Sequence, residues 1–334
     1  MARLIDVATE AGLSPAAVSR YLNGRIDLPQ ATRDRIDAAI VKLGYRPNIH
    51  ARRLSTGRSE SIAIVMPDIA NPFFAEVAGG IESEARGHGL SVNLSLTGGD
   101  RAREIEAVRA LSDASVEGLI LSTNRPDDGT LLRLLARYRE VVLLDEDIPG
   151  AAVPRVFAQN EVGAREATAH LIALGHREIA LIGGPPDLMS VRERLVGYRA
   201  ALAAAGIGDR DDRILLSEYS RAHGRNAALR LLQSEDPPTA IFAASDWIAI
   251  GVIDAARSLG LSIPDDLSLV GFDDMAFAAL VDLTTVRQPI AELGRLAMQR
   301  LAELIAGRAP PRETRVPVDL IRRRSVAAPK ERTR

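Results

Sequence analysis

Residues 13–24 read LSPAAVSRYLNG and decide the fold of the first part of the chain. Ser14 can accept a hydrogen bond from a backbone N–H of the next turn, and Pro15 suits the first helical position, where no N–H is needed. Val18 and Leu22 lie four residues apart and face one side of a helix, and the closing Asn-Gly pair ends it. The stretch therefore predicts a short amphipathic helix that begins at Pro15.

Two further helical patterns flank this stretch. Apolar residues recur at helical spacing over residues 4–11, followed by Gly12, and again over residues 30–43, followed by Gly44. Two short helices joined by a tight turn and closed by a third form a helix-turn-helix domain, whose second helix meets the edges of DNA bases. The alternative is an ordinary three-helix bundle without a nucleic-acid partner.

Charge is divided unevenly along the chain. Residues 1–59 contain ten Arg and Lys against five Asp and Glu, a net charge of +5, whereas residues 60–334 contain 32 against 39, a net charge of −7. Residues 44–59 include four Arg, one His and no acid. A small basic end on a large acidic body indicates contact with nucleic acid, and a solvated basic tail is the alternative.

Composition excludes several classes of function. The 334 residues include no cysteine, which excludes disulfides and thiolate metal sites. The five histidines lack metal-binding spacing, and we find neither a nucleophile–base pair nor a nucleotide loop, so we expect no metal, no cofactor and no enzyme activity. No apolar run has the length of a membrane span and no signal peptide is recognisable, so we expect a soluble cytoplasmic protein.

From residue 61 onward, strand patterns alternate with helical ones. SIAIVM at 61–66 indicates a buried strand followed by a helix from Phe73, and similar pairs recur up to LSLVGF at 267–272. Strands that alternate with helices of this kind predict parallel sheets. The length of the region suits two doubly wound lobes, completed by a last helix over 290–307 and a final strand.

Seven motifs follow one another along the chain: DVATEAGLSPAAVSRYLNG, LGYRPNIHARRLSTGRS, PDIANPFFAEV, GHREIALIGGP, RERLVGY, SDWIAIG and VGFDD. Together they resemble the lac-repressor (LacI/GalR) family of transcriptional regulators, from about Leu4 to Arg324. The resemblance implies an α/β effector domain with the fold of ribose-type periplasmic binding proteins. In that fold the chain crosses between the lobes three times, and the last segment returns to the first lobe.

The resemblance also implies the domain boundaries. We expect a helix-turn-helix DNA-binding domain over 1–44, a hinge helix and linker over 45–59, an N-terminal lobe over 60–158 plus 289–324, a C-terminal lobe over 159–288, and a tail over 325–334.

The same resemblance assigns contacts with double-stranded DNA. Pro15 and Ala16 match the family positions that determine which operator is bound. Because both are apolar, they can contact a thymine methyl but not hydrogen-bond to a base, so we expect Arg20 to contact guanine. Leu54 matches a hinge-helix leucine that enters the minor groove and bends the duplex; the alternative is a buried linker residue. In the family the hinge helices act as a pair, which implies a homodimer on a near-palindromic operator. The family's tetramers carry a C-terminal leucine heptad, and because this sequence shows none, we expect a dimer only. The expected DNA-binding residues are Ser14, Pro15, Ala16, Ser19, Arg20, Asn23, Thr32, Tyr45, Asn48, Ala51, Arg52 and Leu54.

Informative side chains follow the expected strands, where open parallel sheets bind their ligands. Whether Phe73 and Phe74 both face the cleft is left open, and Asp246 is expected to cap the helix over 246–259. By resemblance to the ribose-type members, the expected effector-binding residues are Asn71, Phe73, Phe74, Asp145, Arg194, Tyr219, Ser245, Asp273 and Gln288.

These residue types suit a neutral sugar or polyol. Carboxylates, amides and an Arg fork pair with hydroxyls, and aromatic rings cover the apolar side of a sugar. The acidic residues of the cleft argue against a phosphorylated effector, unless the side chain of Arg125 or Arg192 also reaches into the cleft. Glu146 and Ser245 depart from the Arg of ribose-type binding proteins and the Asn of many relatives, which leaves the exact sugar open.

The operator sequence and the choice between induction and co-repression are also left open. The alternatives to a sugar-controlled repressor are a plain carrier protein, an enzyme on the same fold, and a regulator controlled by a protein partner.

Overall fold

The computed structural model describes residues 2–23, 26–45, 59–109 and 116–330. These residues belong to two units, 1–59 and 60–334. No helix in the described ranges is long and apolar enough to cross a membrane.

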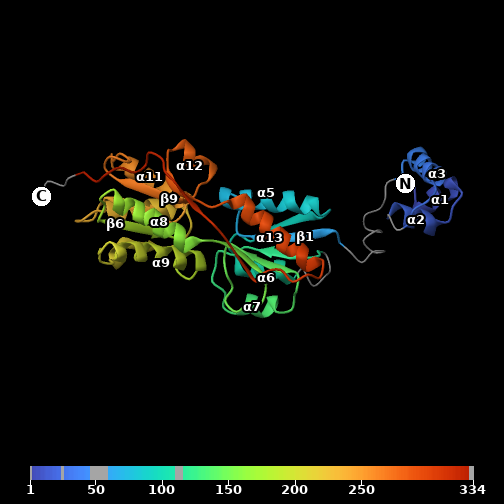
Figure 1. Ribbon diagram of the computed structural model, residues 1–334, viewed down its shortest axis with the longest axis horizontal. Helices are drawn as coiled ribbons and strands as arrows, with labels where there is room; N and C mark the ends of the chain where they lie inside the picture. Colours follow the sequence, from blue (N-terminus) through green and yellow to red (C-terminus); the bar gives the residue numbers. More distant parts are fainter. Residues whose placement is uncertain (1, 24–25, 46–58, 110–115, 331–334) are drawn as a thin grey trace. The chain divides into compact units, whose positions relative to one another are not determined.

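The described residues of the N-terminal unit contain the helices α1, α2 and α3 (Figure 1). Their bounds are α1 (Leu4–Ala11), α2 (Pro15–Leu22) and α3 (Gln30–Leu43). Val7, Val18 and Ile36, one from each helix, are fully buried in a small shared core. The Ser14 hydroxyl accepts a hydrogen bond from the backbone N–H of Ala17 at 3.2 Å and so caps α2. The predicted helix-turn-helix arrangement is confirmed.

Two six-stranded sheets form the second unit, with the orders β11-β5-β4-β3-β1-β2 and β12-β10-β9-β8-β6-β7. Described neighbouring strands are parallel except for the antiparallel β10–β12 pair. The first sheet contains β1 (Ser61–Met66), β2 (Ser91–Leu96), β3 (Leu119–Leu121), β4 (Val141–Leu144), β5 (Arg155–Ala158) and β11 (Glu313–Val316). The second contains β6 (Ile179–Gly183), β7 (Ile214–Leu216), β8 (Ala240–Ala243), β9 (Ser268–Asp273), β10 (Thr284–Arg287) and β12 (Asp319–Ile321).

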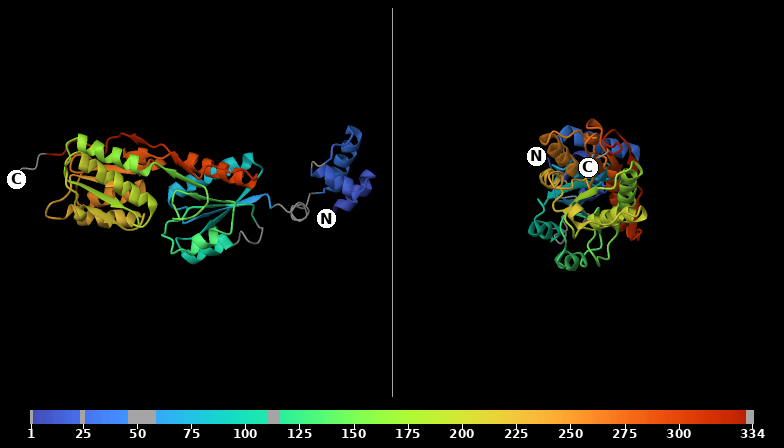
Figure 2. Two further views of the ribbon diagram at one scale, coloured as in Figure 1. Left: turned by 60° about the horizontal axis from the view of Figure 1, so that its bottom comes forward. Right: turned by 90° about the vertical axis from the view of Figure 1, so that its left-hand side faces the viewer.

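Helices cover both faces of each sheet (Figure 2). On β1, Ile62 and Ile64 pack toward α5 and α13, whereas Val65 packs toward α6 and α7, as the period-2 alternation of a strand requires. The first lobe has α5 (Pro72–Gly87), α6 (Arg101–Arg109), α7 (Thr130–Leu135) and α13 (Ile290–Ile305). The second lobe has α8 (Asn160–Ala173), α9 (Met189–Ala204), α10 (Arg221–Leu232), α11 (Asp246–Ser258) and α12 (Ala276–Leu280).

One glycine sets the spacing of the two helices that carry part of the site. A Cβ at Gly197 on α9 would lie 2.2 Å from the Glu161 carbonyl oxygen on α8. Because glycine has no side chain, α8 and α9 pack closely, and Arg194 on α9 reaches Asn160 at the start of α8.

The end of the chain differs from the expected domain boundaries. Residues 289–324 were expected wholly in the N-terminal lobe, but only α13 and β11 belong there, because β12 pairs with β10 of the second sheet. Without β12, β10 would be an unpaired sheet edge. Ser325, the first residue of the expected tail, also contacts the second sheet: the Leu269 N–H donates to the Ser325 carbonyl at 2.8 Å, and the Ser325 hydroxyl donates to the Leu269 carbonyl at 2.6 Å. Residues 319–325 therefore pack on the second lobe.

Candidate effector cleft and DNA-reading helix

Side chains from both lobes enclose a small cavity at the carboxyl ends of the strands. Its volume is about 30 Å³, room for one or two water molecules, so a sugar ring enters only if the lobes or side chains move. Asp145 follows β4 of the first sheet and Asp273 ends β9 of the second, which places the cavity between the lobes. The lining residues are Phe73, Asp145, Ser190, Arg194, Tyr219, Ser245, Asp273 and Gln288.

Seven of the nine residues predicted to bind the effector line this cavity. Asn71 instead caps α5, where its side-chain oxygen accepts from the backbone N–H of Phe73 at 3.1 Å. Phe74 packs in the hydrophobic core, edge to face against Phe73 at 5.2 Å, so only one of the two rings lines the cavity. Sequence reasoning missed Ser190, although it lies between β6 and the RERLVGY motif and obeys the same strand-end rule.

Arg194 is held in place by the protein itself. Its side chain is buried; Nε donates to Asn160 Oδ1 at 2.9 Å and Nη1 donates to the Ala244 carbonyl. The guanidinium carbon lies 3.8 Å from the centre of the Phe272 ring, a cation–π contact, and Nη1 lies 4.0 Å from Asp273 Oδ1. The guanidinium is therefore held in one orientation by the protein.

Two acidic residues of the cavity wall have a strained backbone conformation. Asp145 has φ 69° and Asp273 has φ 116°, in the region that favours glycine. Such strain costs about 1–3 kcal/mol per residue and persists only where the surroundings impose it. Gln288 contributes to this constraint, because its Nε2 donates to Asp273 Oδ1 at 2.7 Å. Strain of this kind is concentrated at functional sites.

The pKa values of three carboxyl groups beside Arg194 are raised by burial. Burial raises the pKa of Asp145 to about 6, against the opposing charge of Arg194. Burial raises the pKa of Asp273 to about 7, opposed by Arg194 and by the hydrogen bond from Gln288. Burial and the neighbouring Asp145 raise the pKa of Glu146 to about 8. A site with this excess of acids disfavours an anionic ligand.

The cavity wall presents unpaired hydrogen-bond acceptors. Among the residues described, Asp145 Oδ1 and Gln288 Oε1 are buried and have no partner. An unpaired buried polar atom costs about 1–3 kcal/mol, so a ligand that donates to both atoms recovers that cost. Neither Arg125 nor Arg192 lines the cavity; Arg192 Nη1 donates to the Asp187 carbonyl instead.

Ser245 has a second role besides the expected one, and Asp246 has a role different from the expected one. The Ser245 hydroxyl accepts from the Trp247 N–H at 3.0 Å, so Ser245 both caps α11 and lines the cavity. The prediction that Asp246 caps this helix is wrong, because its carboxylate accepts from the Thr285 hydroxyl at 2.6 Å and the Met275 N–H at 2.8 Å. In the described part of the chain, no group of His, Cys, Asp and Glu is arranged to hold a metal ion.

The face of α2 that was expected to read DNA is open within its own unit. Pro15, Ala16 and Arg20 are exposed, and Ser19 is half-buried. Asn23 Nδ2 donates to Ser19 Oγ at 3.5 Å at the end of the helix. The structure thus leaves an apolar pair and a guanidinium available to base edges.

The remaining expected DNA contacts lie outside α2. Thr32 is half-buried in the first turn of α3, and Tyr45 packs against the small helical core. The expected hinge contacts Asn48, Ala51, Arg52 and Leu54 lie outside the described residues.

These features define a class of protein: a helix-turn-helix DNA-binding unit followed by a two-lobed α/β unit of the ligand-binding type. Residues 3–48 match the family model of bacterial regulatory proteins of the lacI family, and residues 168–326 match the periplasmic binding protein-like domain. The chain is 33% identical to catabolite control protein A of Priestia megaterium over 90% of this chain and 91% of that protein. The chain belongs to the LacI family of transcriptional regulators, and it is a DNA-binding regulator and not an enzyme.

Two solved structures carry the same fold. The lac repressor dimer bound to operator and the anti-inducer ONPF has a TM-score of 0.87 at 30% identity, over 98% of this chain and 99% of that chain. A LacI family regulator from Enterococcus faecium with bound ribose has a TM-score of 0.72 at 29% identity, over 81% of this chain and all of that chain.

Proposed function

We propose that this regulator is a repressor whose operator affinity is modulated by a neutral sugar or polyol bound between the two lobes. The observation that carries the proposal is the cavity itself, where Asp145 Oδ1 and Gln288 Oε1 lack donors beside a fixed Arg194. Hydroxyl groups donate to the unpaired oxygens and accept from a guanidinium, and Phe73 offers an apolar face to a sugar ring. The ribose held by the Enterococcus faecium relative supports this ligand class.

The excess of carboxyl groups favours an uncharged ligand over a sugar acid or sugar phosphate. A ligand phosphate would meet Asp145 and Asp273 in the cavity wall, with Arg194 as the one cationic group that lines the cavity and Glu146 behind Ser190. Where these carboxyl groups are ionised, their negative charge in a buried site repels a phosphate and raises the free energy of the complex.

On the DNA side, Arg20 reads guanine while Pro15 and Ala16 contact thymine methyl groups. Ser14, Ser19, Asn23, Thr32 and Tyr45 contact the phosphate backbone, and the hinge residues named above contact the minor groove. Because the proposed partner is operator DNA, we propose that the protein acts in the cytoplasm.

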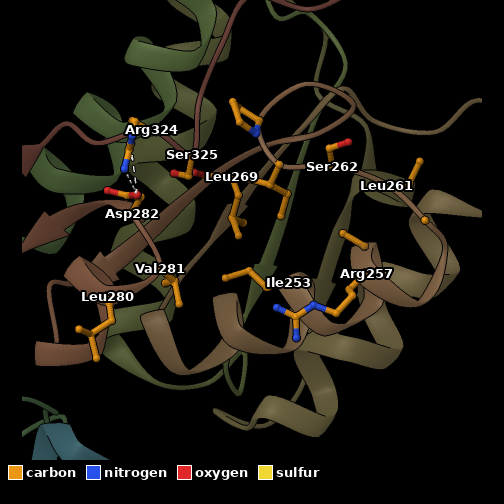
Figure 3. Close-up of a pocket in the computed structure, with 14 residues that line it drawn as sticks. Ile253, Arg257, Leu261, Ser262, Leu269, Leu280, Val281, Asp282, Arg324 and Ser325 are labelled. Atoms are coloured by element: carbon orange, nitrogen blue, oxygen red, sulfur yellow. Dashed lines mark hydrogen bonds and ion pairs between the residues drawn. The ribbon is translucent and has the colours of Figure 1, made fainter.

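A homodimer is part of the proposal, because exposed apolar side chains occur on both lobes. Leu280 is 86% exposed and Val281 is 41% exposed, and both line a surface pocket of about 770 Å³ beside α11 (Figure 3). Leu94 and Leu96 are exposed on β2, an edge strand of the first sheet. A second copy that covers such surfaces brings two DNA-reading helices to a near-palindromic operator.

The test is ligand binding by the purified protein. We expect thermal stabilisation by one or more neutral pentoses, hexoses or polyols, and none by sugar acids or sugar phosphates. Asp273→Asn keeps a residue that tolerates positive φ but removes the carboxylate, so ligand affinity falls about tenfold or more. Asp254→Asn, on the far part of α11, is the matched control and binds as the wild type does. Stabilisation by acidic ligands alone contradicts the proposal.

A further inference from the structure

Glu146 joins the two lobes directly beside the cavity. It follows Asp145 on the first lobe and is 2% exposed. Glu146 Oε2 accepts from the backbone N–H of Ser190 at 3.2 Å, and Oε1 accepts from the Ser190 hydroxyl. Ser190 lies in the first turn of α9 on the second lobe. One buried carboxylate of the first lobe thus receives two hydrogen bonds from one residue of the second.

The connection continues to the cavity wall through Tyr219. The Ser190 hydroxyl lies 3.0 Å from the Tyr219 hydroxyl, and both residues line the cavity. The Tyr219 ring rests on Gly184, where a Cβ would lie 2.4 Å from a ring carbon. A chain of three polar groups therefore runs from Glu146 through Ser190 to Tyr219.

The number of protons that these three groups can donate links the state of Glu146 to that of Tyr219. A serine hydroxyl has one proton to donate, as does a tyrosine hydroxyl. While Glu146 is ionised, Ser190 donates to it and accepts from Tyr219, whose oxygen can then only accept from a ligand. Once Glu146 is protonated, it can donate to Ser190, Ser190 donates to Tyr219, and the Tyr219 proton turns toward the cavity.

We propose that Glu146 is a positioning residue that latches the two lobes together and sets the direction in which Tyr219 donates at the cavity wall. The inference rests on the proposed function, because it concerns the same cavity. With Glu146 ionised, the Tyr219 oxygen becomes a third acceptor beside Asp145 Oδ1 and Gln288 Oε1. The cavity then selects ligands that donate at three points, as a polyol does.

The charged groups that face Glu146 place this change of direction at mildly alkaline pH. Asp145 precedes it in the same loop, Arg194 lies one turn beyond Ser190 on α9, and Tyr219 follows β7. Burial and Asp145 raise the pKa of Glu146 to about 8, against the hydrogen bonds from Ser190 and the charge of Arg194. Both protonation states are therefore populated in an ordinary pH range.

The latch is tested by an interlobe distance in the ligand-free protein. The chain has no native cysteine, so Glu106→Cys on α6 and Arg230→Cys on α10 place spin labels on the exposed faces of the two lobes. Dilution with unlabelled chain removes distances between copies. We expect Glu146→Ala to lengthen and broaden the interlobe distance, Ser190→Ala to do so less, and Glu166→Gln on the exposed face of α8 to change nothing. Wild-type distances in both Glu146→Ala and Ser190→Ala would overturn the latch.

The donation direction is tested by NMR of Tyr219 in protein labelled with ¹³C at the tyrosine Cζ. The five tyrosines are resolved by assigning Tyr219 with Tyr219→Phe. Between pH 6.5 and 9.5 we expect a step in the Tyr219 resonance with a midpoint near 8. Glu146→Gln keeps the size of the side chain and an acceptor oxygen but cannot titrate, so this step disappears. The same step in Glu146→Gln would overturn the proposed direction change.

Both measurements use ligand-free protein, so they are independent of the proposed ligand. If no neutral sugar binds, the proposed function fails while the distances and the Tyr219 resonance still decide the role of Glu146. If sugar binds but neither measurement responds to Glu146→Ala or Glu146→Gln, the inference fails and the proposed function stands.

Discussion

Helix α2, which we propose reads DNA, and the cleft, which we propose binds the effector, are built in opposite ways. Helix α2 is formed by neighbours in sequence, and it leaves Pro15, Ala16 and Arg20 exposed on a rigid local support. The cleft collects residues that are up to 215 positions apart, from Phe73 to Gln288, and buries nearly all its polar groups. Helix α2 presents the positive charge of Arg20 to a partner that carries negative charge. The cleft contains groups of both charges among its own residues, and its backbone is strained at Asp145 and Asp273.

The difference predicts how each region responds to change. A substitution on the exposed face of α2 alters DNA binding with little effect on folding, because nothing else depends on that face. We expect a substitution in the cleft to alter folding, protonation and ligand binding together, because Arg194 compensates the charge of several buried carboxyl groups there.

The largest effect is expected for Arg194→Leu. Loss of the guanidinium leaves the buried carboxyl groups of the cleft without a compensating charge, which costs about 3–5 kcal/mol of the free energy of unfolding and abolishes ligand binding. Arg199→Leu, on the same helix, removes exposed ion pairs with Asp209 and Asp211 and costs at most about 1 kcal/mol. Denaturant unfolding measures both, and equal losses would contradict the contrast between cleft and surface.

A smaller effect, confined to DNA, is expected for Arg20→Ala. Loss of the contact with guanine costs about 1–3 kcal/mol of operator binding and relaxes the preference at one base pair in each half-site. The unfolding midpoint stays unchanged. Arg35→Ala, exposed on α3, is the control: it leaves the base preference intact. Binding of a sequence pool shows the difference, and an unaltered preference in Arg20→Ala refutes the assigned role.

The carboxyl groups of the cleft make stability depend on pH. The pKa values of Asp145, Glu146 and Asp273 are raised to about 6, 8 and 7, so between about pH 4 and 8 the folded state binds more protons than the unfolded state. Their contribution to stability is therefore full below pH 4 and is lost as the pH rises through 6 to 8. Asp145→Asn should reduce the loss between pH 5 and pH 8 by on the order of 2 kcal/mol. Parallel pH profiles of the two proteins would show that Asp145 does not titrate as described.

The smallest effect is expected for Ser14→Ala. The change removes the hydrogen bond that caps α2 and costs about 1 kcal/mol of stability in the N-terminal unit. Ser14→Asp keeps a capping acceptor and restores that stability, although its negative charge weakens binding to phosphates. Thermal unfolding of an isolated fragment is unnecessary, because amide hydrogen exchange in the full chain reports on α2 directly. Unchanged exchange in Ser14→Ala would mean that the cap is dispensable.

The sequence predicted elements that depend on local rules. The caps and apolar spacing located the three N-terminal helices, and the strand-end rule located Asp145, Arg194, Tyr219 and Asp273 near one another. The strand β12 escaped prediction because it has three residues, and its place depends on the free edge of β10 in another part of the chain.

The cleft shows where residue types stop being informative. Asn71-Pro72 has the same capping pattern as Ser14-Pro15, but the prediction followed the resemblance and assigned Asn71 to the ligand. Nothing in the sequence says that of the two neighbouring rings only Phe73 lines the cavity. Ser190 was missed for a related reason, since its importance comes from Glu146 on the other lobe. Side-chain direction and contacts between lobes are set by the whole fold, and local patterns do not encode them.

The most direct test of ligand control is the affinity of the full chain for an operator selected from random DNA, with and without the neutral sugar that stabilises the protein most. Linkage requires that the sugar changes DNA affinity by the same factor as DNA changes sugar affinity. We predict that the sugar changes operator affinity at least about tenfold and that the operator changes sugar affinity by the same factor. We expect Asp273→Asn to abolish both changes. Operator affinity that is the same with and without bound sugar would contradict the proposal that the cleft controls the DNA-reading helix.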